Sequence, residues 1–172
     1  QTLDSNKFPK LEKIHLHTNA LLWNERNWNR IEKSQPYIQS AEISIDAATK
    51  ETYEVVRKGG VWDLLIKNLN FISSLKQVRV LTLSFVVQNK NYKEMSEFYH
   101  LMNTIFENSN ISLNFYYYKL LDWGVMSKED LNSEQIWIET HPNHTDFKKE
   151  VDKLLLLQQK NISHNLWEYG TK

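Results

Sequence analysis

Cysteine is absent from the 172-residue sequence, and glycine occurs only four times. A chain without thiols has no disulfides, no thiolate ligands for zinc or iron–sulfur clusters and no cysteine nucleophile. Gly59-Gly60 is the only adjacent glycine pair, so the sequence contains neither a Walker loop nor a dinucleotide-binding fingerprint. The same shortage of glycine argues against a flavodoxin-like phosphate binder.

Neither sign of charge is in excess, because 21 Lys and Arg residues balance 21 Asp and Glu residues. Nucleic acids and anionic membranes favour clustered positive charge, so we expect neither as a partner. Apolar runs such as Leu154–Leu157 are far too short to cross a bilayer, and residues 1–10 lack the apolar stretch of a signal peptide. We therefore expect a cytoplasmic protein.

Four segments rich in β-branched and aromatic residues have the composition of β-strands. Their starts lie about 30 residues apart, and helical patterns fill the intervals, which is the spacing of repeated βα units. Such units build a parallel sheet, so the sequence predicts a single α/β domain over residues 1–172. The predicted strands are residues 13–18, 42–46, 78–87 and 111–118.

Apolar residues at steps of three and four predict the helices. Such stripes indicate helices over residues 61–75 and from Met95 to Phe106. A shorter helix is expected over residues 50–57, with Thr49 as its N-cap and Gly59 ending it in a left-handed turn. The C-terminal extension, residues 127–172, is expected to be helical over residues 127–139 and 147–159.

Polar side chains stand at the carboxyl end of every predicted strand, where parallel α/β folds gather their functional groups. Strand ends are often polar for other reasons, so position alone does not decide a role. The residues selected in this way are Thr18, Asn19, Ser44, Asp46, Gln88, Asn89, Tyr118 and Lys119.

Ser44 and Asp46 make the end of the second strand the most informative one. Strand alternation places both on one face, opposite Ile43 and Ile45. An aspartate can accept two sugar hydroxyls, and Arg57, one helix later, offers a planar fork for a carboxylate. This combination suits an adenosyl amino acid, whereas an internal Asp46–Arg57 ion pair is the structural alternative.

Other residues support weaker hypotheses. His15 and His17 alternate on one strand face but have no third metal ligand nearby in the sequence, so packed histidines are the better interpretation. Ser44 lacks a nucleophile elbow and an assigned base, which argues against a serine hydrolase. The run Tyr116–Tyr118 could stack on bases, but tyrosines on a buried strand are more often core, and the neutral charge argues against nucleic acid.

The segment Glu42–Gly60, EISIDAATKETYEVVRKGG, closely resembles the fourth-strand segment of radical S-adenosylmethionine enzymes, especially those with an auxiliary SPASM-type domain. Leu16–Ala20 resembles the third strand of that family, with Ala20 standing where glycine is usual. Further stretches resemble the later parts of the same core: residues 83–89 with 92–95, 115–120, and the 141–147 loop. The resemblance covers roughly residues 11–160.

The resemblance implies a partial (β/α) TIM-like barrel of about four parallel strands, units three to six of the family's core. It implies that Ser44 and Asp46 contact the ribose or methionyl part of S-adenosylmethionine and that Arg57 binds its carboxylate. Asn19 and Asn89 would line the same mouth. In the full-length protein the implied reaction is reductive cleavage of S-adenosylmethionine to a 5′-deoxyadenosyl radical, which abstracts hydrogen from a small-molecule or peptide substrate.

One departure concerns the family's Cys-x-x-x-Cys-x-x-Cys loop, whose thiolates hold a 4Fe-4S cluster. The sequence has no cysteine and begins just before the third-strand segment. We therefore expect the chain to be a C-terminal part of a longer enzyme, with the cluster bound only in the full-length protein, and to be inactive alone. A degenerate, non-enzymatic adenosyl-binding or protein-interaction module is the alternative.

No catalytic residue and no metal ligand is assigned within the chain itself. A four-stranded sheet without its neighbours exposes a hydrophobic edge on its third-strand side, so we expect self-association through that edge. The identity of the substrate is set by residues and domains that these patterns do not reveal.

Overall fold

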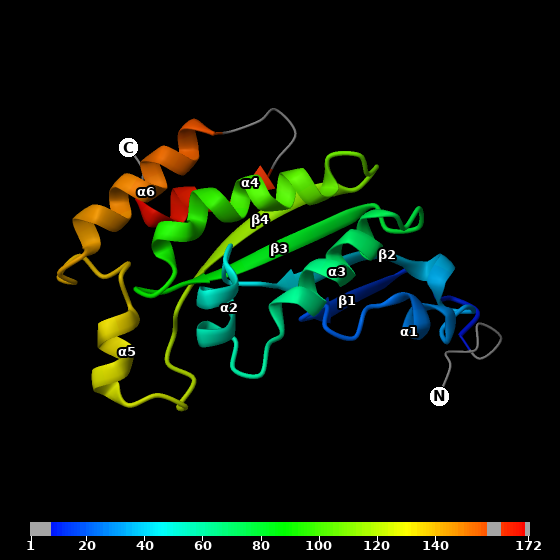
Figure 1. The fold of residues 1–172 in the computed structure, drawn as a ribbon, viewed down its shortest axis with the longest axis horizontal. Helices are drawn as coiled ribbons and strands as arrows, with labels where there is room; N and C mark the ends of the chain where they lie inside the picture. Colours follow the sequence, from blue (N-terminus) through cyan, green and yellow to red (C-terminus); the bar gives the residue numbers. More distant parts are fainter. Residues whose placement is uncertain (1–7, 158–162, 171–172) are drawn as a thin grey trace.

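A five-stranded sheet forms the centre of the computed structural model, which describes residues 8–157 and 163–170 (Figure 1). All neighbouring strands pair in parallel, and their order in the sheet is their order in the sequence. The strands are β1 (Ile14–Thr18), β2 (Ile38–Ser44), β3 (Val80–Val87), β4 (Ser112–Lys119) and the short β5 (Ser163–His164). The parallel α/β fold predicted from the βα spacing is confirmed.

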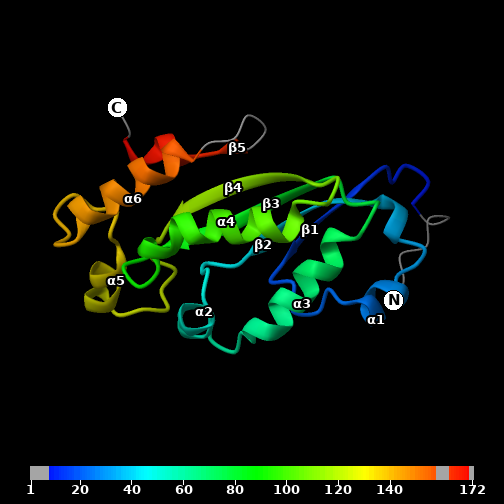
Figure 2. The ribbon, with the colours of Figure 1, turned by 45° about the horizontal axis from the view of Figure 1, so that its top comes forward.

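Helices α1 to α4 connect the strands and lie on one side of the sheet (Figure 2). Right-handed crossovers between consecutive neighbouring strands place every connecting helix on the same face. The helices are α1 (Glu25–Asn29), α2 (Lys50–Val56), α3 (Trp62–Ser73), α4 (Met95–Phe106), α5 (Lys128–Glu134) and α6 (His144–Leu156). Short 3-10 helices are η2 (Gln35–Tyr37), η3 (Tyr92–Glu94) and η4 (Leu166–Tyr169).

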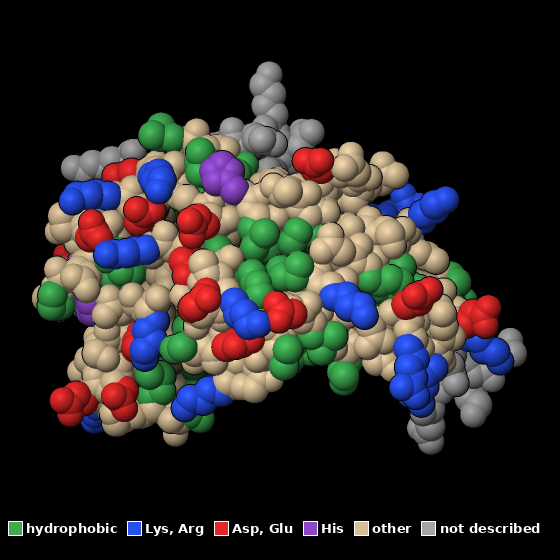
Figure 3. Space-filling view, in the orientation of Figure 1, with side chains coloured by type: hydrophobic (Ala, Val, Ile, Leu, Met, Phe, Trp, Pro, Cys, Tyr) green, Lys and Arg blue, Asp and Glu red, His purple; other side chains and the backbone are tan. Residues whose placement is uncertain are grey.

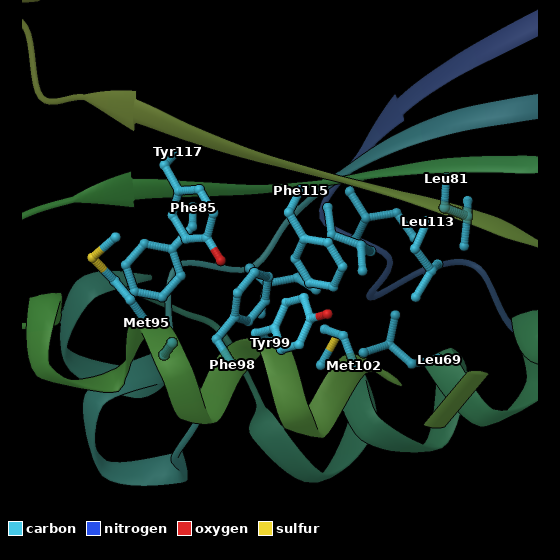
Figure 4. Packing of buried hydrophobic residues seen from close by; sticks show 14 of the residues in the cluster. Leu69, Leu81, Phe85, Met95, Phe98, Tyr99, Met102, Leu113, Phe115 and Tyr117 are labelled. Atoms are coloured by element: carbon cyan, nitrogen blue, oxygen red, sulfur yellow. The ribbon is translucent and has the colours of Figure 1, made fainter. Parts of the chain in front are cut away.

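The hydrophobic core fills the space between the sheet and these helices (Figure 4). Phe98 of α4 lies at its centre, with its ring 5.1 Å from Phe85 of β3 and 5.8 Å from Phe115 of β4. Alternate residues of β3 and β4 point to this side and are buried, as period-two alternation requires. Burial of these side chains is the main source of stability in the fold.

The opposite side of the sheet, here called the polar face, carries hydrogen-bonding side chains in register across the strands. His17 of β1 is paired with Glu42 of β2, Glu42 with Thr82 of β3, and Thr82 with Asn114 of β4. The hydrogen-bonding side chains of the polar face include His15, His17, Ser40, Glu42, Ser44, Thr82, Ser84, Asn114, Tyr116 and Tyr118. Of the predicted tyrosine run, only Tyr117 points into the apolar core.

Strand β2 differs most from its predicted bounds, since it begins at Ile38 rather than Glu42 and ends at Ser44 rather than Asp46. The start of β2 was not predicted because Gln39 and Ser40 are polar and weaken the sequence pattern of a strand. Pairing with β1 nevertheless makes these residues part of the strand. Helix α1 was not predicted at all. It is a short helix whose N-cap, Asn24, accepts a hydrogen bond from the backbone N–H of Asn27.

The start of α2 is fixed by two side chains. Thr49 caps the helix as predicted, and its hydroxyl accepts a hydrogen bond from the Thr52 N–H at 3.3 Å. Glu94 of η3, 45 residues later, accepts hydrogen bonds from the backbone N–H groups of Ala48 and Thr49. Gly59 follows the helix with φ of 80°, which confirms the predicted left-handed turn. The contacts of Thr49 and Glu94 hold the start of α2 beside η3.

The C-terminal part is less helical than predicted. Helix α5 ends at Glu134, and α6 begins at His144 and packs beside α4 and η3. Strand β5 then pairs in parallel with β4, where the side chain of Asn165 both accepts from the N–H and donates to the carbonyl of Tyr117. The first helix predicted in this extension therefore ends five residues earlier than its expected end at residue 139, and a short strand follows the second. Residues 158 and 159 of the second predicted helix lie outside the described residues.

Charges of both signs are scattered over the helix-covered side of the molecule, with apolar side chains between them (Figure 3). This distribution agrees with the balanced composition. Among the described residues, no helix combines the length and the apolar character needed to span a membrane.

Candidate functional site

Asp46 occupies an unusual position directly after β2. Its φ is 66°, a left-handed conformation that is strained for residues other than glycine and is found preferentially at functional sites. The residue is 4% exposed, and Oδ1 accepts a hydrogen bond from the Val86 N–H at 2.7 Å. Oδ2 lies 2.7 Å from Nη2 of Arg57. Burial raises the pKa of Asp46, against the opposing influence of Arg57 and the Val86 N–H.

The left-handed conformation changes the predicted relation between Ser44 and Asp46. Strict alternation stops where β2 ends at Ser44, so the two side chains are not held by one regular strand. Ser44 lies on the polar face, where its hydroxyl is 3.2 Å from the hydroxyl of Ser84. The Asp46 carboxylate instead accepts the hydrogen bond of the Val86 N–H. This side-chain contact continues the pairing of β2 with β3 past the end of β2, so the Val86 N–H has a partner.

Asn91 fastens the two loops that follow β2 and β3. Its side-chain amide donates to the carbonyls of Asp46 and Val86, both at 2.9 Å, and its oxygen accepts from the Gln88 N–H at 2.8 Å. A buried asparagine with all these bonds satisfied holds the left-handed residue in place. Asn91 was not predicted from the sequence, where its only signal was a polar residue four positions beyond the end of a strand.

Arg57 lines a pocket of about 330 Å³ together with Asn19, Tyr53, Gly59 and Gly60. Its guanidinium gives one nitrogen to Asp46, while Nε is buried without a hydrogen-bond partner among the described residues. A buried, unpartnered donor costs free energy unless a ligand or water accepts from it. The pocket is therefore suited to a planar anion such as a carboxylate.

The two glycines shape one wall of this pocket. Gly59 supplies the left-handed turn, and a Cβ on Gly60 would lie 2.6 Å from Cε1 of the Tyr53 ring. Tyr53 is itself buried and packs against Trp62, with ring centroids 5.5 Å apart. Both glycines thus have a structural reason, the left-handed turn at Gly59 and the close approach of the Tyr53 ring at Gly60.

Asn19 reaches the same pocket from the end of β1. Its side-chain oxygen accepts from the Leu21 N–H at 3.2 Å, and the next residue, Ala20, has φ of 60°. The amide of Asn68 on α3 donates to the carbonyl of Ala20 at 2.8 Å and so holds the turn. Ala20 therefore adopts the conformation that favours glycine, the residue usual at this position in the family that the segment resembles.

Asn89 lies elsewhere on the carboxyl edge. Its backbone N–H donates to the carbonyl of Glu134, and its side-chain oxygen accepts from the amide of Asn143 at 3.0 Å. Asn89 does not line the Arg57 pocket. Of the five predicted binding residues, Asn19, Asp46 and Arg57 come together, Ser44 lies on the polar face, and Asn89 contacts the segment between α5 and α6.

The two strand histidines have partners within the sheet. His15 Nδ1 is 2.7 Å from the Ser40 hydroxyl, and His17 Nδ1 is 3.6 Å from a Glu42 carboxylate oxygen. Within residues 8–157 and 163–170, no group of three His, Cys, Asp or Glu side chains is placed to hold a metal ion.

No family model matches the sequence, and no curated protein is significantly similar to it.

Proposed function

We propose that this chain is part of a radical S-adenosylmethionine enzyme core and that its Arg57 pocket binds the methionyl carboxylate of S-adenosylmethionine. The observation that carries the proposal is that Arg57, a residue lining the same pocket as Asn19, has a buried Nε without a partner among the described residues. At about 330 Å³ the pocket is at the small end of ligand sites, so it suits the amino-acid part of the cofactor. Asp46 orients the guanidinium for this role.

The chemistry of the sheet supports a barrel wall. A parallel sheet is normally covered on both faces, and in a doubly wound fold the second face is apolar because helices pack on it. Here the second face carries His17, Glu42, Thr82 and Asn114 in one row. Consecutive strand order and a polar face that suits ligands both favour a partial (β/α) barrel.

The cluster of the full enzyme does not fit the residues present. A 4Fe-4S cluster needs cysteine thiolates, and the sequence contains none. We assign no radical step to the chain itself and expect it to be inactive alone. Treatment with iron and sulfide should yield no stable cluster, and retention of one after gel filtration would contradict this expectation.

Calorimetric titration with S-adenosylmethionine and S-adenosylhomocysteine tests the pocket. The Arg57→Gln variant should bind at least about tenfold more weakly, the loss expected for one hydrogen bond between charged groups. Arg79→Gln is the matched control, because Arg79 is exposed at the opposite edge of the sheet. Thermal unfolding of both variants shows whether a loss of binding reflects a loss of fold.

Three outcomes are informative. Binding that is lost in Arg57→Gln and kept in Arg79→Gln supports the proposal. Equal binding by both variants would show that the ligand does not bind at Arg57. No binding by the unaltered chain would leave the alternative below.

The alternative is a non-enzymatic interaction module with a purely structural Asp46–Arg57 pair. The specific observation in its favour is that both carboxylate oxygens of Asp46 already have partners within the chain, Val86 and Arg57. The ion pair considered from the sequence is thus present, and it leaves only the second lone pairs of the carboxylate for ligand hydroxyls.

We also propose that the chain self-associates through the sheet edge that corresponds to the third strand of the family's core. Strand β1 is the edge strand on that side of the sheet. Beside it lies a largely apolar hollow of about 380 Å³ lined by residues that include Leu16, Leu22, Trp23 and Trp28. Unpaired strand edges template pairing with another chain. Sedimentation velocity should therefore show a species that grows with concentration, and a monomer at all concentrations would argue against this contact.

A further inference from the structure

A second cavity, of about 620 Å³, opens beyond the carboxyl end of β4 and is separate from the Arg57 pocket. Its size is that of a small-molecule site. Residues that line it include Lys119, Trp137, Glu139, Lys148, Glu168 and Tyr169. They come from the last residue of β4, the loop between α5 and α6, helix α6 itself and η4.

Two ammonium groups are held at this cavity by groups that do not neutralise them. Lys119 Nζ lies 5.2 Å from the centre of the Trp137 ring and 5.4 Å from that of Tyr169. Lys148 Nζ donates to the backbone carbonyls of Tyr169 at 2.6 Å and Gly170 at 3.0 Å. Rings and carbonyls orient an ammonium group and attract it but carry no net negative charge.

Five other lysines of the described chain form ion pairs with carboxylates. Lys50, Lys90 and Lys149 each have a carboxylate partner, whereas no ion pair in the described part includes Lys119 or Lys148. The acidic side chains that line the cavity do not form an ion pair with either lysine. Glu168 accepts a hydrogen bond from the Tyr116 hydroxyl at 3.1 Å, and Glu139 is exposed.

We infer that this cavity is a second ligand site, which takes the carboxylate or phosphate group of a small anionic molecule on Lys119 and Lys148. Each ammonium has three N–H donors. The contacts of Lys148 use two, and the ring contacts of Lys119 use none as conventional hydrogen bonds. The remaining donors can therefore bind an anion in a half-buried setting, where charge-assisted hydrogen bonds are strong. The site goes beyond the proposed function, because it uses no residue of the Arg57 pocket.

Titration of the ¹⁵N-labelled chain with inorganic phosphate and with acetate tests this site and separates the two anion classes. Phosphate or acetate should shift the amide signals of residues around Lys119 and Lys148. Binding should weaken about tenfold in Lys119→Gln, which corresponds to about 1.4 kcal/mol. Lys119→Arg should retain it, since the charge and the ring contact are kept.

Lys149→Gln is the matched control, because Lys149 is the next residue on α6 and is exposed. It should leave binding unchanged. Glu139→Gln should strengthen binding, because it removes a negative charge from the cavity lining. Absence of anion shifts in the unaltered chain, or an equal loss in Lys119→Gln and Lys149→Gln, would overturn the inference.

Discussion

The two faces of one sheet follow different rules although they are made by alternate residues of the same strands. On β3, Leu83 and Phe85 point to the helices and are fully buried, while Thr82 points to the polar face. Because the strands pair in register, apolar residues lie beside apolar residues and polar residues beside polar residues on neighbouring strands. The comparison separates residues that hold the fold together from residues that are available for binding.

At the carboxyl edge of the sheet, residues that hold the fold together lie beside residues that are available for binding. There the strained conformation of Asp46 is held by Asn91, and the Arg57 pocket opens beside it. Strain of this kind persists only where surrounding contacts determine it, and it concentrates at sites of function. The rigid apolar face therefore supports the binding geometry that we propose at the edge.

The largest effect should come from the centre of the apolar face. Phe98→Ala should lower the free energy of unfolding by about 3–5 kcal/mol, because it leaves a cavity among Phe85, Phe115 and Tyr117. Asn114→Ala, on the polar face, should cost less than about 1 kcal/mol. Urea denaturation measures both, and similar losses would abolish the distinction between the two faces.

At the carboxyl edge, Asp46→Ala should cost about 2–3 kcal/mol, since it leaves the Val86 N–H and the partly exposed Arg57 without their carboxylate. Asp46→Asn should cost less, because asparagine tolerates the left-handed conformation and can still accept from Val86. Chemical denaturation of the two variants checks this order. If asparagine is as costly as alanine, the ion pair rather than the backbone contact carries the stability of this edge.

The sequence predicted the regular elements well because their signals are local. Apolar periodicity located α3 and α4, and Thr49 and Gly59 marked the start and end of the α2 region. Contacts between residues that are distant in the sequence could not be predicted from local patterns. Glu94 binds the start of α2 from 45 residues away, and β5 pairs with β4 beside Asn165, whose side chain binds Tyr117 of β4.

The candidate site was predicted in part for the same reason. Residue types and strand ends selected Asp46, Arg57 and Asn19, which do come together. No local pattern shows that Asp46 leaves the strand alternation, because that depends on Asn91 and Val86. Lys119 was selected as a strand end, but its ring neighbours and Lys148 are brought to it only by tertiary packing.

Two neighbouring tyrosines sharpen the comparison by titration. Burial, followed by the charge and the hydrogen bond of Glu42, raises the pKa of Tyr118 on the polar face to about 12. Burial raises the pKa of Tyr117 in the core well above its ordinary value of 10.0. The Tyr118 contribution to stability is complete below pH 10 and is lost as the pH rises through 10 to about 12.

Ultraviolet titration of tyrosinate in Glu42→Gln tests this assignment. Removing the negative charge should lower the pKa of Tyr118 towards 10 without reaching it, because burial is the larger cause. Tyr118→Phe identifies the signal. A titration curve that does not change in Glu42→Gln would place Glu42 away from Tyr118.

The smallest expected effect concerns two buried alanines with different backbones. Ala41→Gly, within β2, should cost about 1.5 kcal/mol, from the lost methyl burial and the greater freedom of glycine when unfolded. Ala20 is equally buried but has φ of 60°, so relief of left-handed strain should offset those losses and leave stability within about 0.5 kcal/mol. Parallel urea denaturation of the two variants measures the difference. If both cost the same, the turn at Ala20 imposes no preference for glycine, and this support for the resemblance to radical S-adenosylmethionine enzymes is lost.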